Sequence, residues 1–169
     1  MTGAGAVHQE FEALLREHAG LLSRIAASYE ADPALRDDLL QDMAFALWRA
    51  LPTWRGEAPL RAFIARVAHN RGATHVIGEV RRPPGESLSG DWMASCAGPE
   101  GHAEQEQRRV RLQDAVRRLP VSLRQAVTLA LEGFSHAEIA ETLGISANSV
   151  GVRLHRAKAA LHTVLGEGA

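Results

Sequence analysis

The residues best suited to chemistry in this chain are polar and basic side chains of the kind that bind nucleic acid. One group lies close to the C-terminus, on one side of an apolar repeat; its members are Ser146, Ala147, Asn148, Ser149, Arg153, Arg156 and Lys158. Side chains in the first turns of a helix can enter the major groove of DNA and contact base edges. We therefore predict a contact with duplex DNA, against the alternative of a helical bundle with a solvated basic face.

A second group begins in the loop after Pro52 and continues into the next helix. Its members are Trp54, Arg55, Gly56, Glu57, Ala58, Phe63, Arg66, Asn70, Arg81 and Arg82, with Arg61, His69 and Arg71 interleaved. Basic groups mixed with aromatic and amide groups hold single-stranded nucleic acid by charge and stacking. The same pattern also fits a solvated helix surface, so the helix taken alone leaves both interpretations open.

The C-terminal group needs a helix-turn-helix to position it, and the local sequence predicts one. Ser135 and Glu138 have the spacing of a capping box, which satisfies two free amide groups at a helix start. Gly144 can adopt the left-handed conformation that ends a helix, and Ser146 can cap the next one. The apolar positions of that second helix are spaced by three and four, at Val150, Leu154, Ala157, Leu161 and Leu165.

The N-terminal part is predicted to consist of three helices. Apolar residues recur at three and four over residues 7–29, which predicts one amphipathic helix of about six turns with His18 at its core boundary. Asp32 and Pro33 predict the start of a second helix, over residues 34–51. Its acids crowd the first half, which fits either the helix dipole or a docking face for a basic partner. A third helix is predicted to start at Leu60.

The charge is divided into blocks, although the net charge is only −1. Acids exceed bases in residues 1–48 and 83–107, and bases exceed acids in residues 49–82 and 108–165. The two basic blocks suggest two contacts with phosphate. Residues 83–107 are rich in Pro, Gly, Ser and Glu, as flexible linkers are, and their reach of roughly 27 Å would let the flanking domains sit apart.

Composition limits the remaining possibilities. The chain has 169 residues and 46% hydrophobic content, without a membrane-length apolar segment or a signal peptide, so we expect a cytoplasmic protein. Cys96 is the single cysteine, and the histidines lack a ligand spacing, so neither a metal nor a cofactor is expected. No segment alternates as a strand does. The predicted fold class is all-α, with two small helical domains, residues 7–82 and 108–165, joined by a flexible linker, residues 83–107.

Three segments in order resemble one family, the extracytoplasmic-function group of bacterial RNA polymerase sigma factors. DDLLQDMAFALWRAL resembles its core-polymerase-binding helix, and WRGEAPLRAFIARVAHN resembles its minus-ten recognition segment. LPVSLRQAVTLALEGFSHAEIAETLGISANSVGVRLHRAKAAL resembles its minus-thirty-five domain. Where many members have a lysine that contacts phosphate, this chain has Gly151.

The resemblance implies a role for each group of residues. Docking on the β′ clamp helices of core RNA polymerase would involve Asp38, Leu39, Gln41, Asp42 and Arg49. The Trp54 group would capture a flipped base of the melted minus-ten strand, which costs a few kcal/mol that stacking must return. The acidic linker would thread through the polymerase, and the helix-turn-helix would read minus-thirty-five duplex DNA.

The same resemblance implies partners and leaves two rivals. Expected partners are core RNA polymerase, including its β subunit, promoter DNA and an anti-sigma factor, without membrane contact; the chain itself would not be an enzyme. The first rival is a one-component helix-turn-helix regulator, which binds duplex DNA without polymerase. The second is a helical interaction protein whose helix-turn-helix no longer contacts DNA.

Overall fold

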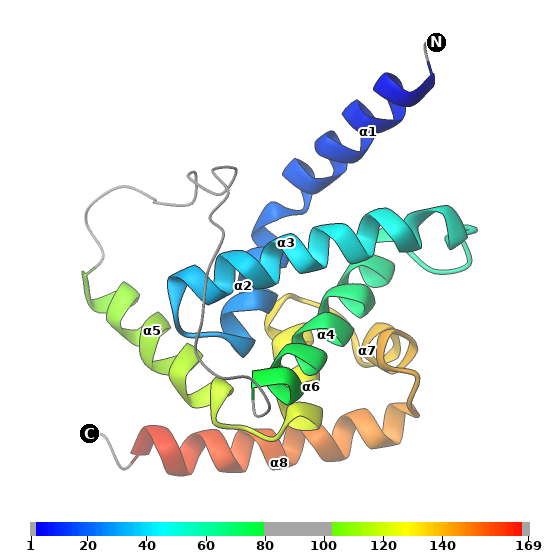
Figure 1. The fold of residues 1–169 in the computed structure, drawn as a ribbon. Helices are drawn as coiled ribbons and strands as arrows, with labels where there is room; N and C mark the ends of the chain where they lie inside the picture. The colour runs from blue at the N-terminus through cyan, green and yellow to red at the C-terminus, as the bar shows by residue number, and fades with distance from the viewer. Residues whose placement is uncertain (1–2, 80–102, 167–169) are drawn as a thin grey trace.

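A computed structural model describes residues 3–79 and 103–166, and every regular element in these ranges is a helix (Figure 1). The N-terminal half contains α1 (Gly3–Glu17), α2 (Ala19–Tyr29), α3 (Pro33–Ala50), the short 3-10 helix η1 (Leu51–Thr53) and α4 (Leu60–Glu79). The C-terminal half contains α5 (Ala103–Arg117), α6 (Val121–Leu131), α7 (His136–Leu143) and α8 (Ala147–Gly166). The prediction of an all-helical fold is confirmed. None of these helices is long and apolar enough to cross a membrane.

Asp32 starts α3 as the sequence predicts. Its carboxylate accepts hydrogen bonds from the amide groups of Ala34 at 2.9 Å and Leu35 at 3.1 Å, with Pro33 in the first turn. These bonds satisfy donors that a helix start otherwise leaves free. The helix then packs against α2 and α4 around fully buried apolar side chains, among them Leu22, Ile25, Leu40, Met43 and Ile64.

The predicted single helix over residues 7–29 is wrong in one respect, because it is divided at His18. This residue leaves helical geometry at φ −103° and ψ 9°, and α2 starts directly after it. His18 is half-buried, at the boundary expected for it. Histidine and the nearby Gly20 are weak helix formers, so a bend costs little there. Of residues 5–17 in α1, only Phe11 is buried, and Figure 1 shows this helix projecting from the body.

Helix α5 begins earlier than the sequence predicts. It starts at Ala103, so the segment from there to residue 107, expected to be linker, is helical. Glu104 and Glu106 stand in its first turn, where the helix dipole favours acids. Glu106 also pairs with Arg109 at 2.6 Å, one turn further along. Cys96 and the other residues of 80–102 lie outside the described residues.

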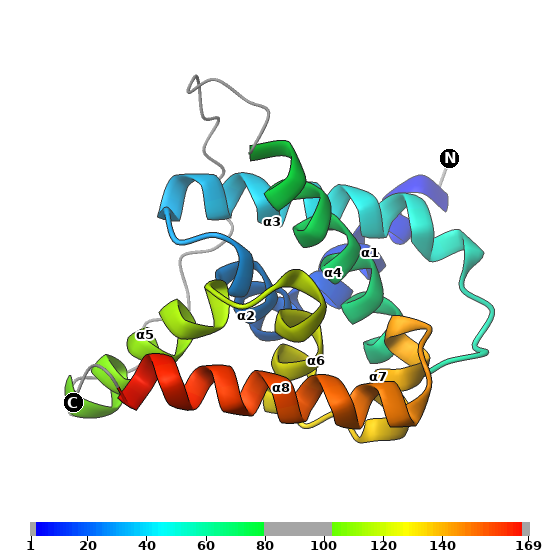
Figure 2. The same ribbon diagram turned by 90° about the horizontal axis from the view of Figure 1, so that it is seen from below.

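The two halves pack against each other. Figure 2 shows α6 and α7 between α8 and the N-terminal helices, and α6 contacts α2 and α4 while α7 contacts α4. Leu129, Phe134 and Ile139 belong to the same buried apolar cluster as Leu22 and Ile64 of the N-terminal half. The linker length allows domains that sit apart, but in this structure they share a core.

A charged contact also joins the halves. Arg24 of α2 donates two hydrogen bonds to the Glu132 carboxylate at the end of α6, at 2.6 and 2.9 Å. Arg61 of α4 donates to the Glu132 carbonyl at 2.7 Å and lies 4.4 Å from the Phe134 ring centroid. The Glu132 side chain is only 8% exposed, so its carboxylate is largely shielded from water.

Candidate nucleic-acid interface

The helix-turn-helix forms as its sequence predicts. The Ser135 hydroxyl accepts from the Glu138 amide at 3.2 Å, and the Glu138 carboxylate accepts from the Ser135 amide at 2.7 Å. The hydrogen bond from the Ser135 backbone lowers the pKa of Glu138, because it favours the charged carboxylate. Gly144 ends α7 at φ +66°, a left-handed conformation that costs glycine little. The capping box and the glycine turn therefore fix the start of α7 and its exit toward α8.

Most of the residues predicted to contact duplex DNA are exposed, at the start of α8 and along its length. Ser146, Ala147, Asn148, Arg156 and Lys158 are exposed, and Ser149 and Arg153 are half-buried. The opposite side is held by Val150, Ala157 and Leu161, which are buried. The Ser146 hydroxyl accepts from the Ser149 amide at 3.1 Å, so Ser146 caps α8 as the sequence predicts.

Two further side chains on the exposed side were missed by the sequence reasoning. Val152 is 42% exposed, and His155 is exposed beside it. The signal was present in the helical period, because residues two and five positions after Val150 fall away from the apolar side. Their exposure makes both available to the DNA that α8 would contact.

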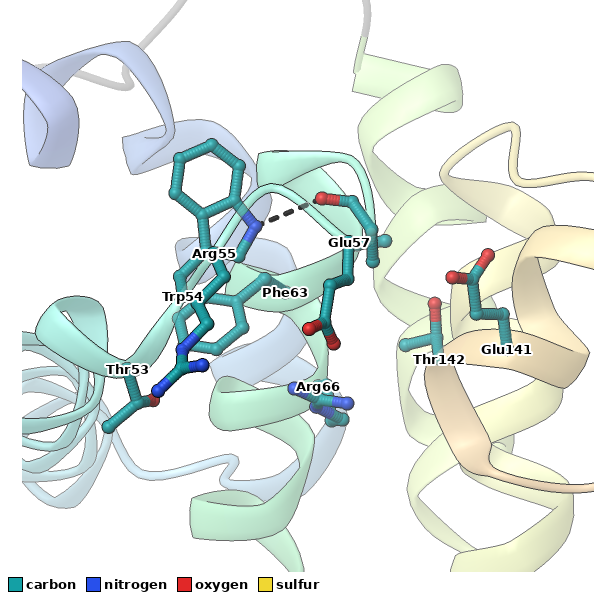
Figure 3. A pocket seen from close by; sticks show the side chains of 10 residues that line it. Thr53, Trp54, Arg55, Glu57, Phe63, Arg66, Glu141 and Thr142 are labelled. Carbon is teal, nitrogen blue, oxygen red and sulfur yellow. Dashed lines mark hydrogen bonds between the residues drawn. The ribbon is translucent and has the colours of Figure 1, made fainter.

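In the loop predicted to hold a base, the Trp54 side chain makes a hydrogen bond across the loop. Trp54 follows η1, and its indole nitrogen donates to the Ala58 carbonyl at 2.9 Å, as Figure 3 shows. Gly56 turns the chain between them at φ +77°. The indole is half-buried and fixed in position by this bond. The loop is therefore a preformed wall beside α4.

This loop and α4 enclose a cavity of about 160 Å³. Among the predicted minus-ten residues, its lining includes Trp54, Arg55, Glu57, Ala58, Phe63 and Arg66. Phe63 is buried, and the Arg66 guanidinium lies 5.4 Å from its ring centroid. An aromatic floor with cations at the rim suits a single nucleobase with its phosphate. Glu141 and Thr142 of α7 form the opposite wall, as Figure 3 shows.

Other residues predicted for this site lie elsewhere. Asn70 is exposed further along α4 and does not line the cavity, and Gly56 is exposed at the loop tip. Arg81 and Arg82 lie outside the described residues. The prediction that His69 lies on the nucleic-acid side of α4 is wrong, because the residue is 1% exposed and lies in the core.

His69 instead serves the core. The Tyr29 hydroxyl lies 2.9 Å from its Nδ1 atom, and the Tyr29 ring lies so close to Gly72 that a β-carbon there would be 2.3 Å from it. Burial lowers the pKa of His69 to about 3 and raises the pKa of Tyr29 above its usual range. Both side chains are therefore uncharged at neutral pH.

The predicted docking helix, α3, presents most of its proposed residues at the surface. Asp42 and Arg49 are exposed, and Asp38 and Gln41 are half-buried. Leu39 is the exception, since at 1% exposure it is a core residue and cannot contact a partner. A helix that packs on both α2 and α4 has a wide buried side, and Leu39 falls within it.

A large apolar side chain lies at the centre of this acidic face. Phe45 is 62% exposed, one turn after Gln41 and one turn before Arg49, whose guanidinium is 5.8 Å from its ring centroid. The sequence reasoning assigned Phe45 no role, although a phenylalanine outside the apolar repeat was a visible signal. Exposed aromatic side chains ringed by charge are typical anchors of protein interfaces.

Comparisons with known proteins place both halves in one family. The description "Sigma-70 region 2" matches residues 14–79, and "Sigma-70, region 4" matches residues 109–161. The "ECF RNA polymerase sigma-E factor" of Escherichia coli is 28% identical over 153 residues, which cover 85% of this chain and 78% of that protein. The protein of the same name from Haemophilus influenzae is 27% identical over 150 residues, covering 83% and 77%.

Solved structures agree on the fold. CnrH, determined in complex with the cytosolic domain of CnrY, superposes with a TM-score of 0.69 at 24% identity, covering 96% of this chain and 91% of that one. The sigma factor RpoE of Bartonella quintana, in complex with the anti-sigma factor NepR, gives 0.68 at 18% identity, covering 94% and 98%. At these identities the likeness supports the two-part helical fold alone.

Proposed function

Because the chain belongs to the sigma-70 family of RNA polymerase sigma factors, in its extracytoplasmic-function group, we propose that it acts with core polymerase as a transcription initiation factor that recognises two promoter elements. The observation that carries the proposal is that one chain holds, in the family order, a helix with an exposed acidic face, a cavity lined by aromatic and basic side chains, and a capped helix with an exposed start. The two matched regions favour this function over a one-component regulator, and the chain would direct the polymerase without catalysing a reaction of its own.

The docking step would use the exposed face of α3. Asp42, Asp38 and Gln41 offer acidic and amide groups to a basic partner, and Phe45 offers an apolar anchor between them and Arg49. Charged rims steer association, while a buried aromatic side chain supplies most of the affinity. We infer that this face binds core polymerase at its β′ clamp helices.

The upstream element would be read by α8. Its start is exposed and positioned by the Ser135 capping box and the Gly144 turn, as required for a helix that enters a major groove. Arg153, Arg156 and Lys158 add cations along the same helix, which suits contacts with the flanking phosphates.

The melted element would be held at the Trp54 cavity. An extruded base would lie against the loop and α4 side of this cavity, which keeps its residues when the α7 wall moves away, with Phe63 beneath it and the Arg55 and Arg66 guanidinium groups near the backbone. Extruding a base costs a few kcal/mol, which stacking and charge must return. Asn70 would contact the strand outside the cavity, since it lies further along α4.

Promoter binding requires the two halves to separate. Elements centred about 35 and 10 base pairs upstream of a start site are roughly 85 Å apart along B-DNA. In the structure, Trp54 and Thr142 of α7 line the same cavity, and α7 packs against both α4 and α8, so the Trp54 loop lies next to the helix-turn-helix. The segment of residues 80–102 is long enough to span roughly 80 Å when extended. We infer that the packed arrangement is a closed state, which opens when polymerase and promoter bind.

An anti-sigma factor is the expected inhibitor. RpoE of Bartonella quintana was determined in complex with one, and CnrH in complex with the cytosolic domain of CnrY. By analogy with their shared fold, we propose that a protein of this class binds the present chain and withholds it from polymerase. We expect it to act where bacterial transcription takes place, in the cytoplasm.

The proposal is tested by reconstituting the full chain with core polymerase and selecting bound fragments from genomic DNA. A sigma factor should enrich fragments protected at two sites about 25 base pairs apart, with strand opening at the downstream site. A regulator would protect one site and would do so without polymerase. Loss of enrichment in Asp42→Arg, with its fold intact, would support docking through α3.

A further inference from the structure

The side of α8 that faces away from the core carries an amide, an isopropyl group and an imidazole on successive turns. These belong to Asn148, Val152 and His155, all exposed. They lie opposite the buried line of Val150 and Ala157, which faces the core. Residues four and three apart on a helix are neighbours, so the three side chains form one strip.

The hydroxyl groups nearby are already engaged. Ser146 and Ser149 lie 2.9 Å apart through their Oγ atoms, and the Ser146 hydroxyl also accepts from the Ser149 amide. In the part of the chain that the structure describes, the Asn148 amide makes no hydrogen bond. Of the polar groups in this first turn, Asn148 therefore has the most donor and acceptor capacity to offer a base.

The residue next to Val152 has no side chain, since it is Gly151. A β-carbon built at Gly151, the residue before Val152, would meet nothing within 4 Å, so the space beside the helix is open at that position. Because Gly151 has no side chain, the valine methyl groups can reach into a groove that closes on the helix backbone.

We propose that Asn148 and Val152 determine the base preference of the upstream element, Asn148 by binding an adenine and Val152 by contacting the methyl group of a thymine. This inference rests on the proposed function, since it assumes that α8 enters duplex DNA. An amide pairs with adenine through N6 and N7, and apolar side chains contact the thymine C5 methyl group in the major groove. The two residues are about 6 Å apart along the helix, which corresponds to about two base pairs.

The test uses the holoenzyme on a promoter that it has selected. Each thymine of the upstream element is replaced in turn by deoxyuridine, which lacks only the methyl group. The wild-type holoenzyme should bind one such promoter about fourfold more weakly, the effect of one buried methyl group. The Val152→Ala holoenzyme should bind the thymine and deoxyuridine promoters equally, whereas the Val152→Ile holoenzyme should bind the thymine promoter more tightly, as the wild type does. Asn148→Ala should reduce the preference for one adenine by at least about fivefold.

The outcomes separate this inference from the function beneath it. If the holoenzyme selects no promoter, the proposed function is overturned and the inference falls with it. If a promoter is selected but no thymine methyl group matters, or if Val152→Ala keeps the full methyl effect, only the inference is overturned. Val152 and Asn148 are exposed, so both variants should fold, which circular dichroism checks.

Discussion

Replacing Glu132 by glutamine should open the closed state. The carboxylate accepts two hydrogen bonds from Arg24, and Arg61 lies 3.7 Å from one of its oxygens. Both arginines belong to the other half of the molecule, so the charge of Glu132 acts across the contact between halves. Glutamine keeps the shape of the side chain but loses the charge and one acceptor oxygen.

The magnitude follows from this geometry. A hydrogen bond to a charged group contributes about 1.5–3 kcal/mol, and breaking a buried pair costs more. Arg24 and Arg61 are 54% and 44% exposed, so water screens much of this energy, while the backbone bond from Arg61 to the Glu132 carbonyl remains. We expect a loss of about 2 kcal/mol, which lowers the closed-to-open ratio roughly 30-fold.

The assay measures the distance between the halves. Fluorescent labels are placed on cysteines substituted for Thr74 of α4 and His162 of α8, both exposed, in a background with Cys96→Ser. Single-molecule energy transfer then reports the populations of short and long distances. Glu132→Gln should move population to the long distance, and small-angle scattering should show a radius of gyration above the roughly 16 Å of a compact chain of this length.

A matched charge change provides the control. Glu12 pairs with Arg16 on the surface of α1, away from the contact between halves, so Glu12→Gln should leave both distances populated as in the wild type. An unchanged distance distribution in Glu132→Gln, or an equal change in both variants, would mean that the charge of Glu132 does not hold the halves together. The first result would mean that apolar packing alone holds the halves together.

Three further predictions concern DNA affinity, docking and acid stability. Gly151→Lys should fold normally, because a β-carbon at this position has open space. It should bind duplex DNA more tightly, with a slope of log affinity against log salt concentration that is steeper by about 0.9. Gly151→Ala should not change this slope. Phe45→Ala should weaken binding to core polymerase at least about fivefold without loss of stability. Val7→Ala should not weaken it, because Val7, 53% exposed against 62% for Phe45, lies outside that face. The pKa of His69 is about 3 in the folded chain against about 6.5 in the unfolded chain, so its imidazole is neutral in the fold. Its contribution to the free energy of unfolding is therefore complete above pH 6.5 and is lost as the pH falls toward 3. The free energy of unfolding should therefore drop by about 2 kcal/mol between pH 7 and 5 in denaturant titrations, and His69→Asn should remove that dependence, while the same slope in His69→Asn would contradict it.

Local chemistry explains what the sequence predicts well. Caps and turns depend on neighbouring residues, so Asp32, the Ser135 capping box and Gly144 could be assigned from spacing alone. The exposed start of α8 follows from the same period that buries Val150. The candidate DNA-reading surfaces therefore follow largely from local pattern.

What the sequence misses depends on tertiary packing. The docking role of Leu39 comes from the family resemblance alone, whereas its apolar character and its packing against α2 and α4 bury it at 1% exposure. The sequence predicts His69 on the nucleic-acid side, and its burial could not be predicted locally, because its partner Tyr29 lies on another helix. Glu132 gave no signal at all, since its two arginines come from the other half of the chain. Contacts between residues distant in sequence decide all three positions.

Run-off transcription with purified components tests most directly whether the chain starts transcription with core polymerase. Core polymerase, the full chain and a fragment selected by their complex are combined, and the labelled transcript is measured with and without the chain. If the chain is an initiation factor, a transcript of defined length should appear that requires the chain and that Asp42→Arg strongly reduces. Absence of a chain-dependent transcript from every selected fragment would contradict that role.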